Sequence, residues 1–96
     1  MGIVTDTLEG VIDEQLWFHY DLANDVLYLR LAAHRDTPTV AQETPEGFLL
    51  LRREDNDALV GLTVVNWWKR FGRGARPDSI SQLEHLIEPW AAKLAA

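Results

Sequence analysis

The sequence predicts a single α+β domain over residues 1–96, with an antiparallel β-meander of four to five strands packed against a C-terminal helix. Short stretches of alternating apolar and polar residues come first, joined by polar connections too short for crossover helices. After residue 79 the apolar spacing changes from two to three or four, which is typical of an amphipathic helix. Apolar residues make up 47% of the chain and charged residues 25%, as in a folded globular domain.

The N-terminal segment has the pattern of a short helix. Asp6 followed by Glu9 resembles a capping box, which satisfies the first backbone amides of a helix. The apolar residues that follow recur at helical spacing: Leu8, Val11, Ile12 and Leu16. Gly10 lowers the helix propensity, yet the spacing favours a short N-terminal helix.

The middle of the chain has the two-residue period of strands. In VLYLRL, residues 26–31, the three leucines share one face, and Val26, Tyr28 and Arg30 share the other. The polar DLAND before it is turn material, so residues 17–20 and 26–31 should form a hairpin. Further strands are expected at residues 39–44, 48–54 and 58–67.

The last of these strands is apolar on both faces. Val60, Leu62 and Val64 share one face, whereas Leu59, Val65 and Trp67 share the other. A strand with two apolar faces needs cover on both sides of the sheet. The C-terminal helix is one cover, and the N-terminal segment or a second subunit is the other. For so small a domain, we expect a homodimer.

The C-terminal helix carries its own start signal. Ser79 and Gln82 form a capping box, and a stripe at spacings of three and four follows: Ile80, Leu83, Ile87, Trp90 and Leu94. Pro89 interrupts the helix because it lacks an amide donor and clashes with the preceding turn. Since the stripe continues past it, we expect a kink at Pro89 and not a stop.

Charge is unevenly distributed along a chain whose net charge is −6. The first 25 residues hold six acids and no Lys or Arg, whereas four of the nine cations lie between Lys69 and Arg76. The segment 67–76 also holds Trp67, Trp68 and Phe71, and three interpretations stay open: a structural or subunit contact, a protein-partner site, or a nucleic-acid or anion site. The predicted partner-binding residues are Trp68, Arg70, Phe71 and Arg73.

Reactive chemistry has little support in the sequence. There is no cysteine, so disulfides and thiolate sites are excluded. His19, His34 and His85 are scattered without ligand spacing, so no catalytic, cofactor or metal site is predicted. A ligand site on the sheet would need a pocket holding His19, Tyr28 or Arg30. Without a signal peptide or apolar span, we expect a cytoplasmic protein with no membrane contact.

The middle of the chain resembles a known family. Tyr20 and Asp21, then Asp25 before Leu-Tyr, then Glu43 and a late Val-Gly pair are similar to the small bacterial family called domain of unknown function 2283. The resemblance covers about residues 18–67. It departs at 51–53, which are Leu-Arg-Arg, and at 57–58, which are Asp-Ala. It implies a small β-meander protein without an assigned reaction, with an antitoxin-like role beside a toxin-like partner.

These observations lead to one functional expectation and one alternative. We expect a non-enzymatic, homodimeric protein-interaction module. The alternative is nucleic-acid or anion binding through the basic aromatic segment 67–76, which the net charge of −6 disfavours.

Overall fold

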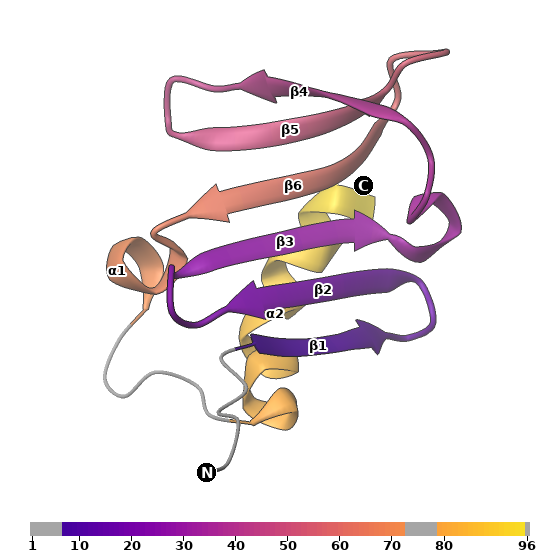
Figure 1. Ribbon diagram of the computed structural model, residues 1–96. Coiled ribbons are helices and arrows are strands. Elements are labelled where there is room, and N and C mark those ends of the chain that lie inside the picture. The colour runs from indigo at the N-terminus through magenta and orange to yellow at the C-terminus, as the bar shows by residue number, and fades with distance from the viewer. Residues whose placement is uncertain (1–6, 73–78, 96) are drawn as a thin grey trace, which may run out of the picture.

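The computed structural model describes residues 7–72 and 79–95, which form one antiparallel sheet and a helix packed on one of its faces (Figure 1). The α+β class is therefore confirmed. The elements are β1 (Thr7–Ile12), β2 (Leu16–Asp21), β3 (Val26–Leu31), the 3-10 helix η1 (Ala32–His34), β4 (Thr39–Glu43), β5 (Phe48–Arg53), β6 (Leu59–Val65), α1 (Trp67–Phe71) and α2 (Ile80–Ala95).

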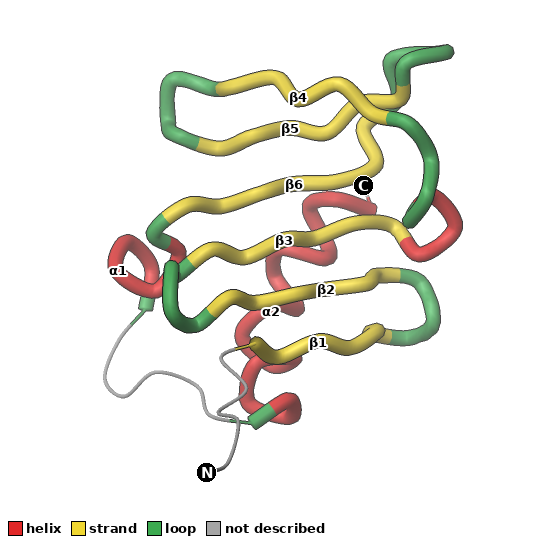
Figure 2. The backbone as a smooth tube through the Cα atoms, viewed as in Figure 1, coloured by secondary structure: helices red, strands yellow, loops and turns green. Residues whose placement is uncertain are grey.

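The sheet consists of two three-stranded meanders joined side by side. Its strand order is β1-β2-β3-β6-β5-β4, and every neighbouring pair is antiparallel. After β3 the chain passes through η1 and a loop to the far edge, then returns by two hairpins until β6 pairs with β3 (Figure 2). We call the strand ends next to this loop the crossover end, and the opposite ends the α1 end.

The expected strand count of four to five is wrong, because the sheet has six strands and the predicted N-terminal helix is strand β1. Leu8 and Ile12 both pack against the core. Their spacing of four suits the two-residue period of a strand as well as the period of a helix. Gly10 lies between them, opposite the fully buried Phe18.

The turn between β1 and β2 explains why a hairpin forms there. Asp13 and Glu14 have φ values of 51° and 60°, and the amide of Gln15 donates to the carbonyl of Ile12 over 3.0 Å. Positive φ at both central residues is typical of the tight turn whose twist matches that of two paired strands. A helix cannot continue through two left-handed residues, so the chain reverses.

Strand alternation and register divide the sheet into a helix face and an open face. The helix face carries the core, whose buried members include Phe18, Tyr20, Leu27 and Leu29. Leu83 and Ile87 of α2 complete that core and are fully buried. Helix α2 contacts both β1 and β6 and lies behind the sheet in Figure 1, whereas β4 and β5 extend beyond it.

The start of α2 matches the prediction. The amide of Gln82 donates to the Ser79 hydroxyl oxygen over 3.3 Å, which is the N-cap half of the predicted capping box. The helix also continues through Pro89 to Ala95, so the proline does not end it. The kink at Pro89 stays a prediction.

The predicted strand 58–67 begins one residue too early and ends two residues too late. Strand β6 ends at Val65, and Asn66 takes a left-handed conformation with φ 57°. Trp67 and Trp68 therefore open the short helix α1 and do not continue the strand. This change of direction places the two tryptophans at the α1 end of the sheet.

Candidate functional site

Helix α1 holds three of the four predicted partner-binding residues: Trp68, Arg70 and Phe71. The fourth, Arg73, lies outside the described residues. We call Trp68, Arg70 and Phe71, together with Phe48 of β5, the α1 corner. The corner closes the α1 end of the sheet beside the β4–β5 turn.

The position of α1 is set by a buried carboxylate on the β2–β3 turn. Asp25 is 8% exposed, and its two carboxylate oxygens accept from the amide of Trp68 over 2.8 Å and the amide of Lys69 over 3.0 Å. The hydroxyl of Tyr20 donates to the same carboxylate over 2.6 Å. In addition, the amide of Trp67 donates to the Asp25 carbonyl. Asp25 thus joins a core tyrosine to the first turn of α1.

The two adjacent tryptophans take different environments. Trp67 is 2% exposed and meets the Tyr20 ring edge-on, with 5.1 Å between centroids. Trp68 is half-buried and packs on the edge of the core. A Cβ at Gly72 would lie 1.9 Å from the Trp68 ring, so Gly72 has to be glycine for that ring to stay in place.

Arg70 is held by aromatic rings and a backbone carbonyl. Its guanidinium carbon lies 5.0 Å from the ring centroids of both Phe48 and Phe71. Those two rings stack at 6.0 Å. The guanidinium also donates to the carbonyl of Glu46. The result is a preorganised aromatic and cationic surface in which the Phe71 side chain is 45% exposed.

The open face of the sheet carries a second aromatic group. Trp17 and His19 have ring centroids 5.9 Å apart, and His19 meets Tyr28 edge-on at 5.6 Å. The Trp17 indole donates to Glu9 over 2.8 Å, and Arg35 lies over the indole at 5.0 Å while pairing with Glu9. Because Arg35 belongs to the crossover loop, these contacts place that loop against the open face.

Two hollows mark the ends of the open face. One, of about 270 Å³ at the crossover end, is lined by residues that include Trp17, Tyr28, Arg30 and Arg35. The predicted pocket residues Tyr28 and Arg30 therefore share a hollow, but His19 does not line it. The Arg30 guanidinium already donates to the Arg35 carbonyl over 2.8 Å and the Thr39 hydroxyl over 2.9 Å. These donors stabilise the crossover loop.

The second hollow, of about 580 Å³, lies at the α1 end. Its lining includes Glu43, Leu49, Val65 and Arg70, so it connects the open face to the α1 corner. Glu43, Leu49 and Val65 come from three adjacent strands, β4, β5 and β6. The lining of this hollow therefore combines apolar side chains with two glutamates and the cation Arg70.

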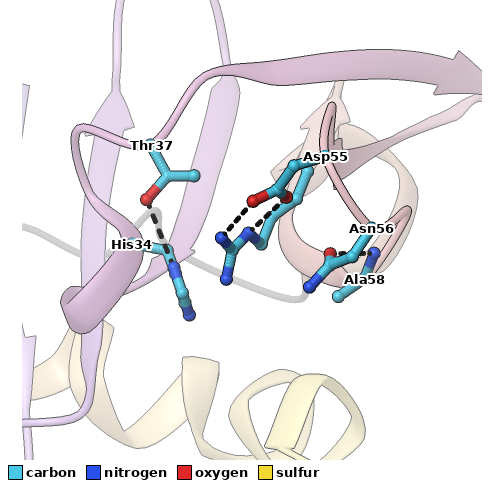
Figure 3. Close-up of polar contacts among 6 residues, drawn as sticks. His34, Thr37, Asp55, Asn56 and Ala58 are labelled. Carbon is cyan, nitrogen blue, oxygen red and sulfur yellow. Dashed lines mark hydrogen bonds and ion pairs between the residues drawn. The ribbon is translucent and has the colours of Figure 1, made fainter.

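Shifted pKa values occur at two turn carboxylates. The side-chain amide of Asn24 donates to Asp21 over 2.8 Å and lowers the pKa of that carboxyl. The pKa of Asp55 is lowered chiefly by Arg53, whose guanidinium makes two hydrogen bonds of 2.9 and 2.5 Å with it (Figure 3). Both shifts favour the charged carboxylate and come from local turn contacts. Such contacts are typical of turn structure.

The described residues hold neither a metal-binding cluster nor a helix that could span a membrane. Within residues 7–72 and 79–95, no three His, Cys, Asp or Glu side chains come together as a metal site would require. Neither of the two described α-helices is long and apolar enough to cross a membrane. The Nδ1 atom of His34 lies 3.2 Å from the Thr37 hydroxyl oxygen, a contact within the crossover loop (Figure 3).

The comparisons with known proteins add no relatives to this description. No family model matches the chain, and the searches of curated proteins and of solved structures also return no match. The resemblance to domain of unknown function 2283 therefore stays a prediction.

Proposed function

We propose that the protein is a non-enzymatic, homodimeric protein-interaction module that contacts a protein partner through the α1 corner. The observation that carries this proposal is the packing of the Arg70 guanidinium against the stacked rings of Phe48 and Phe71, with Phe71 45% exposed. Arginine and aromatic side chains supply most of the binding free energy at protein interfaces. Their contacts within the fold hold them in place before a partner binds, which lowers the entropy cost of association.

The rest of the described chain supports a binding role over a catalytic one. Asp21 and Asp55, two carboxylates on turns, have lowered pKa values. A general acid needs a raised pKa, which burial in a cleft supplies. The homodimer has separate support, because the open face exposes apolar side chains of several strands.

Partner capture tests the role of the α1 corner. The purified protein, immobilised by a terminal tag, is incubated with lysate of its native cell, and bound proteins are identified by mass spectrometry. We expect one defined partner whose capture falls at least about tenfold in the double variant Arg70→Ala with Phe71→Ala, a loss of about 1.4 kcal/mol or more.

A matched control separates the corner from general surface effects. The double variant Arg52→Ala with Leu86→Ala also removes one arginine and one exposed apolar side chain, from the crossover end of β5 and from α2. It should capture the partner as the unchanged protein does. Equal capture by the corner variant and the control would remove the α1 corner from the proposal.

A further inference from the structure

Among the described residues, the crossover loop covers the open face of the sheet only at the crossover end, through Arg35. The rest of the face carries many apolar side chains. Tyr28, Val65 and Val11 lie on it and are 37%, 41% and 46% exposed. Leu49 and Leu51 of β5 are half-buried beside them. An apolar surface that extends across five strands is typical of an interface and not of a solvated face.

The strand register divides the open face into two charged halves. Glu9, Asp21 and Glu43 lie in the half toward the α1 end. Arg30 and Arg53 lie in the half toward the crossover end. Apart from His19, the open-face residues between the two groups are apolar or small. A face that is acidic at one end and cationic at the other is complementary to its own copy when that copy is turned end to end.

We propose that a second copy of this chain covers the open face, related by a two-fold axis that lies between the two sheets and runs across the strands. The axis passes between the row of Tyr28 and Thr63 and the row of Arg30 and Gly61. This arrangement brings the acidic half of each copy against the cationic half of the other. The proposal rests on the proposed homodimer and specifies which surface forms it.

The two-fold axis pairs particular side chains across the interface. Each strand lies over the same strand of the other copy, running in the reverse direction, so Tyr28 faces Arg30 of the partner subunit. Leu49 in the same way faces Leu51 of the partner subunit, which buries two leucine pairs per dimer. Tyr28 and Arg30 form a cation–π pair, which is stronger when it is removed from water.

Thr63 and Gly61 leave room for this approach at the centre of the face. Thr63 is 7% exposed, and a Cβ at Gly61 would lie 2.9 Å from the Leu29 carbonyl oxygen and 2.9 Å from the Leu51 side chain. β6 is therefore the low floor between the taller side chains of β3 and β5. Two such faces interlock, because the side chains of each copy enter the low strand of the other.

The size of the face fits a dimer interface. Six strands spaced about 4.8 Å apart, each about 20 Å long, give a footprint of about 600 Å². Side-chain relief raises the accessible area above this footprint, toward the roughly 800 Å² that each partner buries in an ordinary stable complex. The open face is thus large enough for a second copy.

Cross-linking tests the proposal directly, because the chain has no cysteine and a single introduced thiol reacts alone. The variant Leu49→Cys is treated with a bismaleimide that spans about 10 Å, the spacing of two stacked sheets. We expect a covalent dimer as the main product. The control Val40→Cys places an exposed thiol on the helix face of β4, 55% exposed, and should stay monomeric on a denaturing gel.

Charge complementation tests the pairing of Leu49 with Leu51 of the partner subunit. The variants Leu49→Lys and Leu51→Asp should each self-associate at least about tenfold more weakly than the unchanged chain. Mixed together, they should form a heterodimer more readily than either self-associates, as measured by native mass spectrometry. Circular dichroism of each variant confirms that it folds.

The outcomes separate this inference from the proposed function. If the unchanged chain is dimeric but Leu49→Cys does not cross-link, the second copy binds elsewhere and only the open-face interface is refuted. If the unchanged chain is monomeric, the homodimer itself is refuted. If cross-linking succeeds but the mixed variants do not associate, the face is correct and the end-to-end arrangement is overturned.

Discussion

Substitution of Asp25 tests how the fold holds the α1 corner. Asp25→Asn keeps the size of the side chain and tolerates the left-handed backbone, φ 55°, at this position. It removes the charge and replaces one of the two accepting oxygens by an NH2 donor, which then faces a backbone amide of α1. Hydrogen bonds to charged groups contribute about 1.5 to 3 kcal/mol each. The Asp25 carboxylate accepts three hydrogen bonds, from the amides of Trp68 and Lys69 and from the Tyr20 hydroxyl. Because these bonds share one carboxylate, their contributions are not additive, and we expect the free energy of unfolding to fall by about 2 to 3 kcal/mol.

Urea unfolding followed by tryptophan fluorescence measures this loss. With an m value of about 1.5 to 2 kcal/mol/M, the midpoint should fall by about 1 to 2 M. Protein concentration has to be the same in every titration, since dimerisation adds to apparent stability. A destabilisation below about 0.5 kcal/mol would refute the argument that Asp25 anchors α1.

Two further variants isolate the cause. Asp57→Asn makes the same chemical change at an exposed turn residue with φ 62°. It should change stability by less than about 0.5 kcal/mol. Tyr20→Phe removes the hydroxyl that donates to Asp25 and should cost about 1 to 2 kcal/mol. Tyr20→Phe should destabilise the Asp25→Asn variant less than it destabilises the unchanged chain, because the Tyr20 hydroxyl and the Asp25 carboxylate share one hydrogen bond.

Three other predictions follow from the described contacts. Asn24→Ala should raise the pKa of Asp21 toward its ordinary value of 3.8 in an NMR titration. In the unchanged chain, the lowered pKa of Asp21 stabilises the fold above pH 3.8, and this stabilisation is lost as the pH falls through the pKa of the folded state. An Asp21 pKa that is the same in the Asn24→Ala variant would contradict this prediction. Gly72→Ala should displace the Trp68 ring and weaken partner capture, whereas capture at full strength would separate Trp68 from the site. Labelled single-stranded oligonucleotides should not bind at low salt, because Arg70 is engaged within the fold and the net charge is −6; salt-sensitive binding would favour the nucleic-acid alternative.

The sequence predicts those elements whose signals are local. The alternation in residues 26–31, the turn chemistry of Asp21 and Asn24, and the N-cap hydrogen bond from Gln82 to Ser79 all appear in the structure. Each depends on residues within a few positions of one another, so propensity and pattern are sufficient. The prediction of a second apolar face on β6 is wrong, because Trp67 lies in α1 and Leu59 packs against the core. On the open face β6 presents Gly61 and Thr63, with Val65 as its apolar residue.

The sequence fails where spacing is ambiguous or pairing is distant. The spacing of Leu8 and Ile12 is compatible with both a helix and a strand. The left-handed turn at residues 13–14 favours the strand, because a helix cannot continue through it. Strand order depends on β3 pairing with β6, for which a single sequence carries no local signal. The link from Asp25 to the amide of Trp68 spans 43 residues, so a turn aspartate gave no sign that it anchors a helix.

The molecular mass in solution tests the central claim, a homodimeric interaction module, most directly. Light scattering at tens of micromolar, well above the dissociation constants of ordinary stable dimers, should return twice the chain mass of 10.9 kDa. The Leu49→Lys variant should shift toward 10.9 kDa under the same conditions, and Val40→Lys should not. A mass of 10.9 kDa for the unchanged chain at that concentration would contradict the homodimer.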